Sequence, residues 1–262
     1  MLFRFSNKGV TKWNLKTIFH NIDISILTIY IYINININEG LNMYTFSLDI
    51  ETIPNPAMEA LLPEPDVKLG NVKDPKKIEE KRIEAKEKQL NSMALKAETG
   101  MIASFSMSGD IEKSAVLQEV SYSNEIELIN EIFLSLSTDV VTLITFNGMD
   151  FDLPFIYKRA MINGIDLTQF NGLLPLSYWM KRYTVEPHCD IMKVWSNWSN
   201  DIKGCSLDYL GSLLLGERKT DRDYSQYLEY IQTGKSDIVL ADNVCDSQLT
   251  MRLYNKMNKY LF

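Results

Sequence analysis

One segment near the start of the chain, YTFSLDIETIPN at residues 44–55, alternates almost perfectly between apolar and polar residues. Successive side chains of a β-strand point to opposite faces, so this pattern predicts a strand with one apolar and one polar face. The polar face ends in Asp49 and Glu51, which lie roughly 6.5–7 Å apart along a strand. Two carboxylates this close repel each other unless something neutralises them, and divalent cations with oxygen ligands do so. The strand therefore combines a core-forming face with a candidate cation site.

The pattern of the remaining chain predicts a mixed sheet flanked by helices. Two strands joined by a Ser-Gly-Asp turn are expected at 101–107 and 115–120. The β-branched run at 140–146 is typical of a strand covered on both faces. Apolar periodicity predicts helices near 124–137, 152–163, 191–198, 206–215 and 236–260. This order of elements is typical of an α/β layered domain.

Composition divides the chain into parts. Residues 1–42 include a low-complexity alternation of Ile, Tyr and Asn, which is too short and too interrupted by Asn to span a bilayer. We expect them to be an extension ahead of a natural start at Met43; a flexible or strand-forming arm is the alternative. Residues 43–262 are expected to form a single domain. Within it, 66–98 is a charged helical insertion, in which Asp74 followed by Pro75 is a typical helix start.

The overall charge and the few special residues narrow the class of function. A formal net charge of −7 argues against a protein that binds nucleic acid by charge alone, but permits one that holds a polyanion through bound cations. The three cysteines form no CxxC, which suits a reducing compartment, and we expect a cytoplasmic protein. Neither GxxxxGK[ST] nor GxGxxG occurs, so P-loop nucleotide hydrolysis and dinucleotide redox chemistry are disfavoured.

Two later segments carry further acids. In FNGMDFDLPFI, at 146–156, a predicted strand ends, Asn147 and Gly148 turn the chain, and Asp152 opens a helix. Sites of α/β proteins commonly lie at such strand ends. In the helix expected at 236–260, Asp242 and Asp246 share a face, which costs stability unless a cation or a hydrogen bond offsets it. Each observation is weak alone, but together and in this order they indicate one acidic site.

These residues resemble a known family. Asp49-Ile-Glu51, Asn147-Gly-x-x-Phe151-Asp152 and the helical Asp246 look like the three motifs of the DEDD superfamily of 3′–5′ exonucleases. The resemblance covers about residues 44–262 and is strongest to stand-alone exonucleases similar to the proofreading domain of family B DNA polymerases. It implies a ribonuclease H-like mixed sheet, in which a three-stranded antiparallel meander is joined by parallel strands and flanked by helices.

The resemblance also implies a metal-dependent 3′–5′ exonuclease that hydrolyses phosphodiester bonds with two Mg²⁺ or Mn²⁺ ions. Asp49 would bridge both ions, Glu51 and Asp246 would bind the ion on the nucleophile side, and Asp152 would act on the other through ligand water. The residues implied to seat the terminal nucleotide are Ile50, Thr52, Ile53, Asn147 and Phe151.

The expected partner is a single-stranded or frayed 3′ end, with DNA favoured over RNA, together with replication or repair proteins acting in trans; no membrane partner is expected. Two alternatives stay open. One is an RNA-directed exonuclease, and the other is a nucleic-acid-binding protein that keeps the fold but has weakened catalysis.

One position departs from the family pattern. Such families carry a Tyr four residues before the last Asp, or a His five before it, and this chain has Asp242 and Ala241 there. Asp242 is therefore either a catalytic group that hydrogen-bonds the attacking water or a surface acid in a degraded site. Three other features are interpreted as structural: the pair His188 and Asp190, the tryptophans Trp179, Trp195 and Trp198 as core residues, and the basic segment 216–222 as a helix-end loop.

Overall fold

The computed structural model describes residues 44–137, 141–199, 205–219 and 223–261. The prediction about residues 1–42 lies outside these ranges. Within them the chain forms a five-stranded sheet with the order β3-β2-β1-β4-β5. The strands are β1 (Tyr44–Pro54), β2 (Gly100–Gly109), β3 (Lys113–Val116), β4 (Val141–Thr145) and β5 (His188–Asp190).

The pairing of the strands confirms the predicted mixed sheet. Strands β1, β2 and β3 form an antiparallel meander, and β4 and β5 add parallel strands on the other side of β1. Strand β2 pairs with β1 along Phe46–Pro54, and β4 pairs with it along Tyr44–Ser47, so the side chains of β1 are held at a fixed register. Edge strand β3 covers 113–116 and not the predicted 115–120, which shortens the exposed edge of the sheet.

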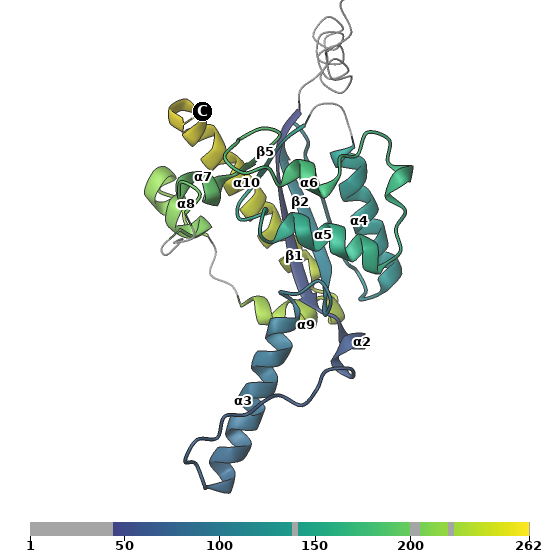
Figure 1. Ribbon diagram of the computed structural model, residues 1–262, viewed down its shortest axis with the longest axis vertical. Helices are drawn as coiled ribbons and strands as arrows, with labels where there is room; N and C mark the ends of the chain where they lie inside the picture. The colour runs from purple at the N-terminus through teal and green to yellow at the C-terminus, as the bar shows by residue number, and fades with distance from the viewer. Residues whose placement is uncertain (1–43, 138–140, 200–204, 220–222, 262) are drawn as a thin grey trace, which may run out of the picture. The chain divides into compact units, whose positions relative to one another are not determined.

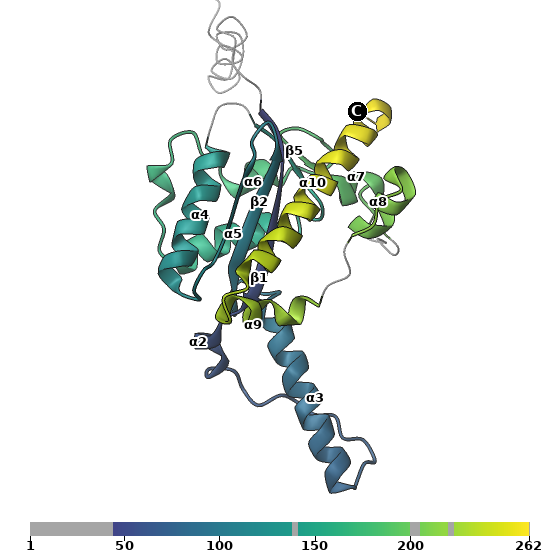
Figure 2. The ribbon, with the colours of Figure 1, turned by 180° about the vertical axis from the view of Figure 1, so that it is seen from behind.

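Helices cover both faces of this sheet (Figures 1 and 2). They are α2 (Pro56–Glu59), α3 (Pro75–Met93), α4 (Tyr122–Leu136), α5 (Asp152–Ile162), α6 (Leu176–Trp179), α7 (Ile191–Trp195), α8 (Leu207–Leu215), α9 (Tyr227–Gln232) and α10 (Ser236–Leu261). Helices α4 and α5 lie on one face, and α10 crosses the other. None of the helices in the described ranges is both long and apolar enough to cross a bilayer.

The face under α4 and α5 is apolar. Phe46, Leu48 and Ile50 of β1 point to this side and are at most 4% exposed. They pack in one cluster with Ile129 and Phe133 of α4. Fully burying a side chain of this size stabilises the folded state by about 1.5–3 kcal/mol, so this face supplies much of the stability of the domain.

A buried ion pair joins the helices on the same face. The guanidinium of Arg159 donates to both carboxylate oxygens of Glu125, at 2.8 and 2.6 Å, and both side chains are at most 1% exposed. Glu125 also accepts from the backbone N–H of Ile102, and Arg159 donates to the carbonyl of Ala97. These hydrogen bonds compensate for the loss of hydration that a buried charge suffers.

The contact between α10 and the middle of the sheet is polar. The hydroxyl of Ser47 donates to the carbonyl of Ser247 at 2.7 Å, and the hydroxyl of Ser104 donates to the side-chain oxygen of Asn243 at 3.1 Å. The Ser106 and Ser247 hydroxyls lie 2.7 Å apart. We call these five residues the polar seam. Their small side chains let α10 approach β1 and β2 closely, and apolar packing of α10 resumes further along, at Leu249 and Leu253.

The charged insertion forms α3, which extends away from the sheet (Figure 1). As predicted, Asp74 caps this helix by accepting from the N–H of Lys76, and Pro75 occupies the first helical position. Of its residues only Met93 is buried, so the helix is mostly solvated.

Candidate active site

Three acids from the two ends of the described chain meet beside the polar seam. Asp49 and Glu51 leave β1 on the same face, and Asp246 reaches them from α10. Each offers a carboxylate oxygen, and these oxygens lie within 4.8 Å of one another. The amide nitrogen of Asn243, in the polar seam, donates to Asp49 at 2.5 Å. The fold thus brings together three of the acids that the sequence singled out.

The turn after β4 delivers the fourth acid. Asn147 has φ 68°, a conformation that Asn tolerates better than most residues. A Cβ at Gly148 would meet the side chain of Thr145 at 2.4 Å, so only glycine fits there. Helix α5 then begins at Asp152, whose carboxylate accepts from the N–H of Ile50 at 3.0 Å. Asp152 is therefore tied to the backbone directly after Asp49.

Asp190 and His188 hold this turn in place. Asp190 accepts from the N–H groups of Asn147 and Met149 at 3.0 and 2.9 Å. The ring of His188 lies 2.8 Å from the hydroxyl of Thr145 and 2.9 Å from the carbonyl of Trp179. Both side chains are buried and fully engaged, which agrees with the structural role predicted for them.

Crowding and burial change the protonation of the acids. Burial raises the pKa of Glu51 to about 8 and that of Asp152 to about 7. Burial, with the charges of Asp152 and Glu51, raises the pKa of Asp49 well above its usual value, and burial also raises that of Asp246. Without a cation the cluster therefore favours protonated carboxyls, and a bound cation would favour the charged forms.

Lys219 supplies one positive charge to the cluster, a contact that the sequence did not predict. Its ammonium forms an ion pair with Asp246. The segment was interpreted as a helix-end loop, and Gly216 does end α8 with φ 73°. The backbone N–H of Lys219 then donates to Asp208 at 2.8 Å, which turns the loop toward α10. Although burial favours the neutral amine, the charge of Asp246 raises the pKa of Lys219.

Asp242 is not a surface acid. It is 3% exposed and accepts a 2.7 Å hydrogen bond from the hydroxyl of Tyr227, which is fully buried in α9. Burial, the charge of Glu51 and the bond to Asp242 raise the pKa of Tyr227, so its hydroxyl stays protonated as the donor. Spacing along the sequence does not reveal the contact between Tyr227 and Asp242, because the two residues lie in different helices.

The chain was compared with known proteins. Residues 95–261 match a family described as predicted 3′–5′ exonucleases related to the exonuclease domain of PolB, and this match covers more than half of the chain. The chain belongs to this family. The mixed sheet agrees with the ribonuclease H-like fold implied by the resemblance. The matched region contains Asp152, Asp242 and Asp246, while Asp49 and Glu51 of β1 precede it.

Curated relatives of this exonuclease-family chain include viral DNA polymerases. The DNA polymerase of Autographa californica nuclear polyhedrosis virus is 27% identical over 156 residues, and that of Bombyx mori nuclear polyhedrosis virus is 26% identical over 156 residues. Each alignment covers 53% of this chain and 16% of the polymerase. The chain therefore corresponds to a small part of these relatives.

Some residues implied to contact a nucleotide have other roles in this member of the exonuclease family. Ile50 and Ile53 are 4% and 0% exposed, and both side chains pack in the apolar core. The hydroxyl of Thr52 donates to the carbonyl of Ala94 at 2.7 Å. These side chains of the strand after Asp49 therefore face the core and the end of α3, and the nucleotide contacts implied for this segment stay a prediction. Phe151 packs on Phe155 but stays partly exposed, as does Asn147.

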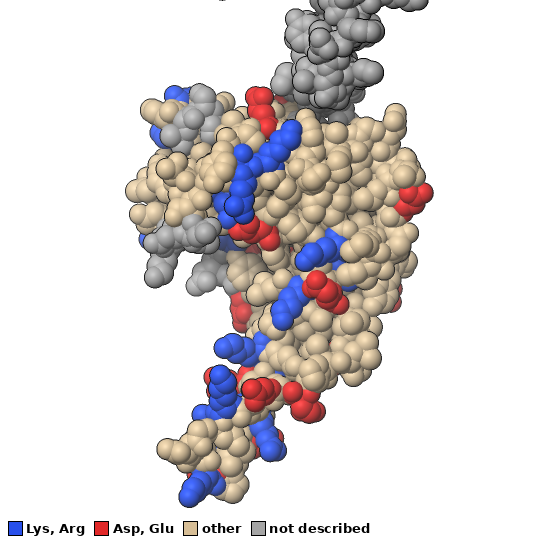
Figure 3. All heavy atoms as spheres, in the orientation of Figure 1, with Lys and Arg blue, Asp and Glu red and all other residues tan. Residues whose placement is uncertain are grey.

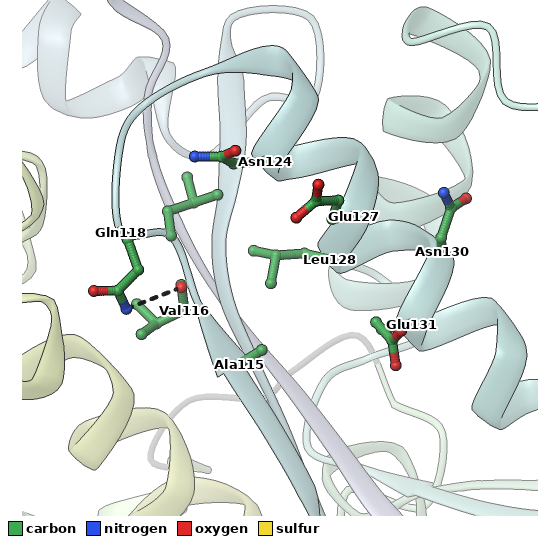
Figure 4. Close-up of a pocket in the computed structure, with 9 residues that line it drawn as sticks. Ala115, Val116, Gln118, Asn124, Glu127, Leu128, Asn130 and Glu131 are labelled. Atoms are coloured by element: carbon green, nitrogen blue, oxygen red, sulfur yellow. Dashed lines mark hydrogen bonds between the residues drawn. The ribbon is translucent and has the colours of Figure 1, made fainter.

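A hollow in the described ranges lies away from the acids. It has a volume of about 560 Å³ and lies between β3 and α4 (Figure 4). Its lining includes Val116, Gln118, Leu128 and Glu131. None of the clustered acids lines it, so this hollow is separate from the acidic site.

Proposed function

We propose that this protein is a metal-dependent 3′–5′ exonuclease that removes nucleotides from single-stranded DNA ends. The observation that supports it is the convergence of Asp49, Glu51 and Asp246 oxygens within 4.8 Å. Asp152 joins them through the Ile50 N–H. Four acids gathered at one site of a family member, with viral DNA polymerases among its relatives, suit hydrolysis of a phosphodiester.

The residues fit two Mg²⁺ or Mn²⁺ ions. These ions prefer hard oxygen ligands, and four carboxylates supply them. In this proposal Asp49 would contribute to both ions, Glu51 and Asp246 would hold one, and Asp152 would act on the other through water. When bound, the ions would activate the attacking water and stabilise the leaving oxygen.

Other groups of the chain orient this site. Asn243 fixes one oxygen of Asp49, and Tyr227 fixes one oxygen of Asp242. The Asp242 carboxylate, held beside Glu51, takes the position where related families have a tyrosine. We assign to the Tyr227–Asp242 pair the hydrogen-bonding role of that tyrosine, so that a carboxylate with a fixed orientation receives the attacking water.

The test is hydrolysis of a 5′-labelled DNA oligonucleotide with Mn²⁺. We expect a ladder that shortens from the 3′ end, stops on addition of EDTA, and falls by more than about 100-fold in Asp49→Asn and Asp246→Asn. Glu79→Gln, on the exposed surface of α3, is the matched control and should keep full activity. An RNA oligonucleotide of the same sequence measures the preference for the sugar.

A second function is favoured by one observation, the absence of a tyrosine at position 242. It is a nucleic-acid-binding protein with weakened catalysis. Intact substrate in the assay above, with retention of the oligonucleotide that EDTA abolishes, would support this function and overturn the exonuclease.

A further inference from the structure

A second surface of chemical interest lies next to the turn that carries Asp152. Side chains of three segments line a small groove there, namely Met149, Asp150, Met180, Arg182, Lys193 and Trp198. We call it the basic–aromatic groove. Its wall begins two residues before Asp152, and the N–H of Met149 is held by the same Asp190 that fixes Asn147. The groove and Asp152 therefore share the turn at 147–152.

Positive charge gathers at this groove in a chain whose net charge is −7. In Figure 3, Lys and Arg atoms form a run over the area where Figure 1 draws β5, α6 and α7. Lys193 is neutralised by Asp150, at 2.5 Å. Arg182 is exposed, and no carboxylate in the described part of the chain pairs with it. Its guanidinium therefore remains able to bind an anion.

Aromatic rings border the same groove. Tyr183 is 76% exposed, and its ring centroid lies 5.3 Å from that of Trp198. Both residues have positive φ, of 63° and 60°. This conformation is rare for aromatic residues and is kept only where the surroundings enforce it. Trp195, one turn earlier, is 39% exposed, so the prediction that these tryptophans are core residues holds for Trp179 and is wrong for Trp195.

We propose that the basic–aromatic groove binds the single-stranded segment of the substrate on the 5′ side of the nucleotide being removed. This inference rests on the proposed exonuclease function. Arg182 contacts a phosphate, and the rings of Trp198 and Tyr183 stack on a base. Such contacts suit any sequence, because every nucleotide has a phosphate and every base has a π-face. The groove would therefore hold a strand of any sequence while its 3′ end lies among the acids.

The experiment compares a long substrate with a short one. An oligonucleotide of about twelve nucleotides reaches the groove, whereas thymidine 5′-monophosphate p-nitrophenyl ester occupies only the acidic site. For Arg182→Ala we expect the KM for the oligonucleotide to rise about fivefold to tenfold, and the salt dependence of binding to fall by about 0.7 in slope. For Trp198→Leu we expect about a tenfold rise, with most of the affinity kept in Trp198→Phe. Hydrolysis of the ester should not change.

Controls separate this inference from the proposed function. Arg82→Ala removes an exposed arginine from α3 and should change neither substrate. Fluorescence anisotropy with Ca²⁺ in place of Mn²⁺ measures the Kd of the oligonucleotide even for an inactive protein. An unchanged Kd and KM in Arg182→Ala and Trp198→Leu would overturn the groove while leaving the exonuclease intact. An equal loss on both substrates would also overturn it. A wild-type protein that hydrolyses neither substrate would overturn the exonuclease alone.

Discussion

The two faces of the central sheet differ in what they hold. The face under α4 and α5 is packed with aliphatic and aromatic side chains, and its one buried ion pair, Glu125 with Arg159, has its hydrogen bonds satisfied. Where α10 crosses the other face, serines and an asparagine make the contact, and acids with raised pKa values stand beside them. One face is arranged for stability, and the other carries charges that destabilise one another.

The difference shows how a single sheet can carry an unfavourable cluster. The acids lie on β1, the strand at the centre of the sheet, which is fixed by neighbours on both sides and by the apolar core behind it. Repulsion among the acids cannot move such a strand far. Changes on the apolar face should therefore affect mainly stability, and changes on the other face mainly activity.

The largest effect is expected at Arg159. Its replacement by Met leaves the buried carboxylate of Glu125 without its cation, and loss of one partner from a buried pair costs about 3–5 kcal/mol. The melting temperature should fall by roughly 10 °C. Activity per folded molecule should stay the same. The control is Lys158→Met, on the same helix as Arg159. It breaks an exposed ion pair with Glu98 and should cost less than about 1 kcal/mol. A similarly small loss of stability in Arg159→Met would contradict the inference that the face under α4 and α5 determines the stability of the fold.

The next effect concerns pH and the metal-free protein. The folded pKa of Glu51 is raised from 4.5 to about 8, so the folded state binds more protons than the unfolded chain between these values. Stability from this group is present below about pH 4.5 and is lost as the pH rises toward 8. Glu51→Gln should therefore gain in melting temperature over wild type by several degrees as the pH rises from 5 to 8, in EDTA. A constant difference across this range would show that the cluster is not strained.

A smaller effect is expected from Tyr227→Phe, which removes only the hydroxyl that fixes Asp242. We expect kcat to fall about tenfold, equivalent to about 1.4 kcal/mol, with little change in KM or in the melting temperature. Tyr230→Phe is the matched control, since its hydroxyl donates to Gln226 at the exposed surface. If Tyr227→Phe lowers the melting temperature but leaves kcat unchanged, the hydroxyl stabilises the fold and does not contribute to catalysis.

The smallest effect on stability is expected at the polar seam. Ser247→Ala removes one partner of Ser106 and should cost about 1 kcal/mol. The double variant Ser106→Ala with Ser247→Ala should recover most of this loss, because the Ser106 hydroxyl is removed together with its partner. Urea unfolding measures both. A loss of several kcal/mol in the single variant would mean that the seam, and not the apolar face, determines the stability of the sheet.

The local sequence pattern was enough to predict the main helices and strands and the acids that they carry. The alternation in β1, the β-branched run in β4 and the periodicity of α10 each report the environment of one element, and Asp49, Asp152 and Asp246 follow from their places in those elements. The family resemblance then assigned them to one site, and the structure brings Asp49, Glu51 and Asp246 together.

Contacts between distant elements could not be predicted in this way. The hydroxyl of Tyr227 reaches Asp242 from a different helix, and the ammonium of Lys219 reaches Asp246 from a loop, so neither spacing nor periodicity encodes them. Short helices such as α9 were also missed, since a turn or two carries little periodic signal.

The place of α10 has a consequence for synthesis of the protein. Asp49 and Asn243, which contact each other, are separated by 194 positions in the chain. A ribosome therefore completes β1 long before the helix that supplies Asp246 emerges. Under the proposed two-ion mechanism both contributions are needed, so the nascent chain would stay inert towards nearby nucleic acid, including its own message, until α10 has docked.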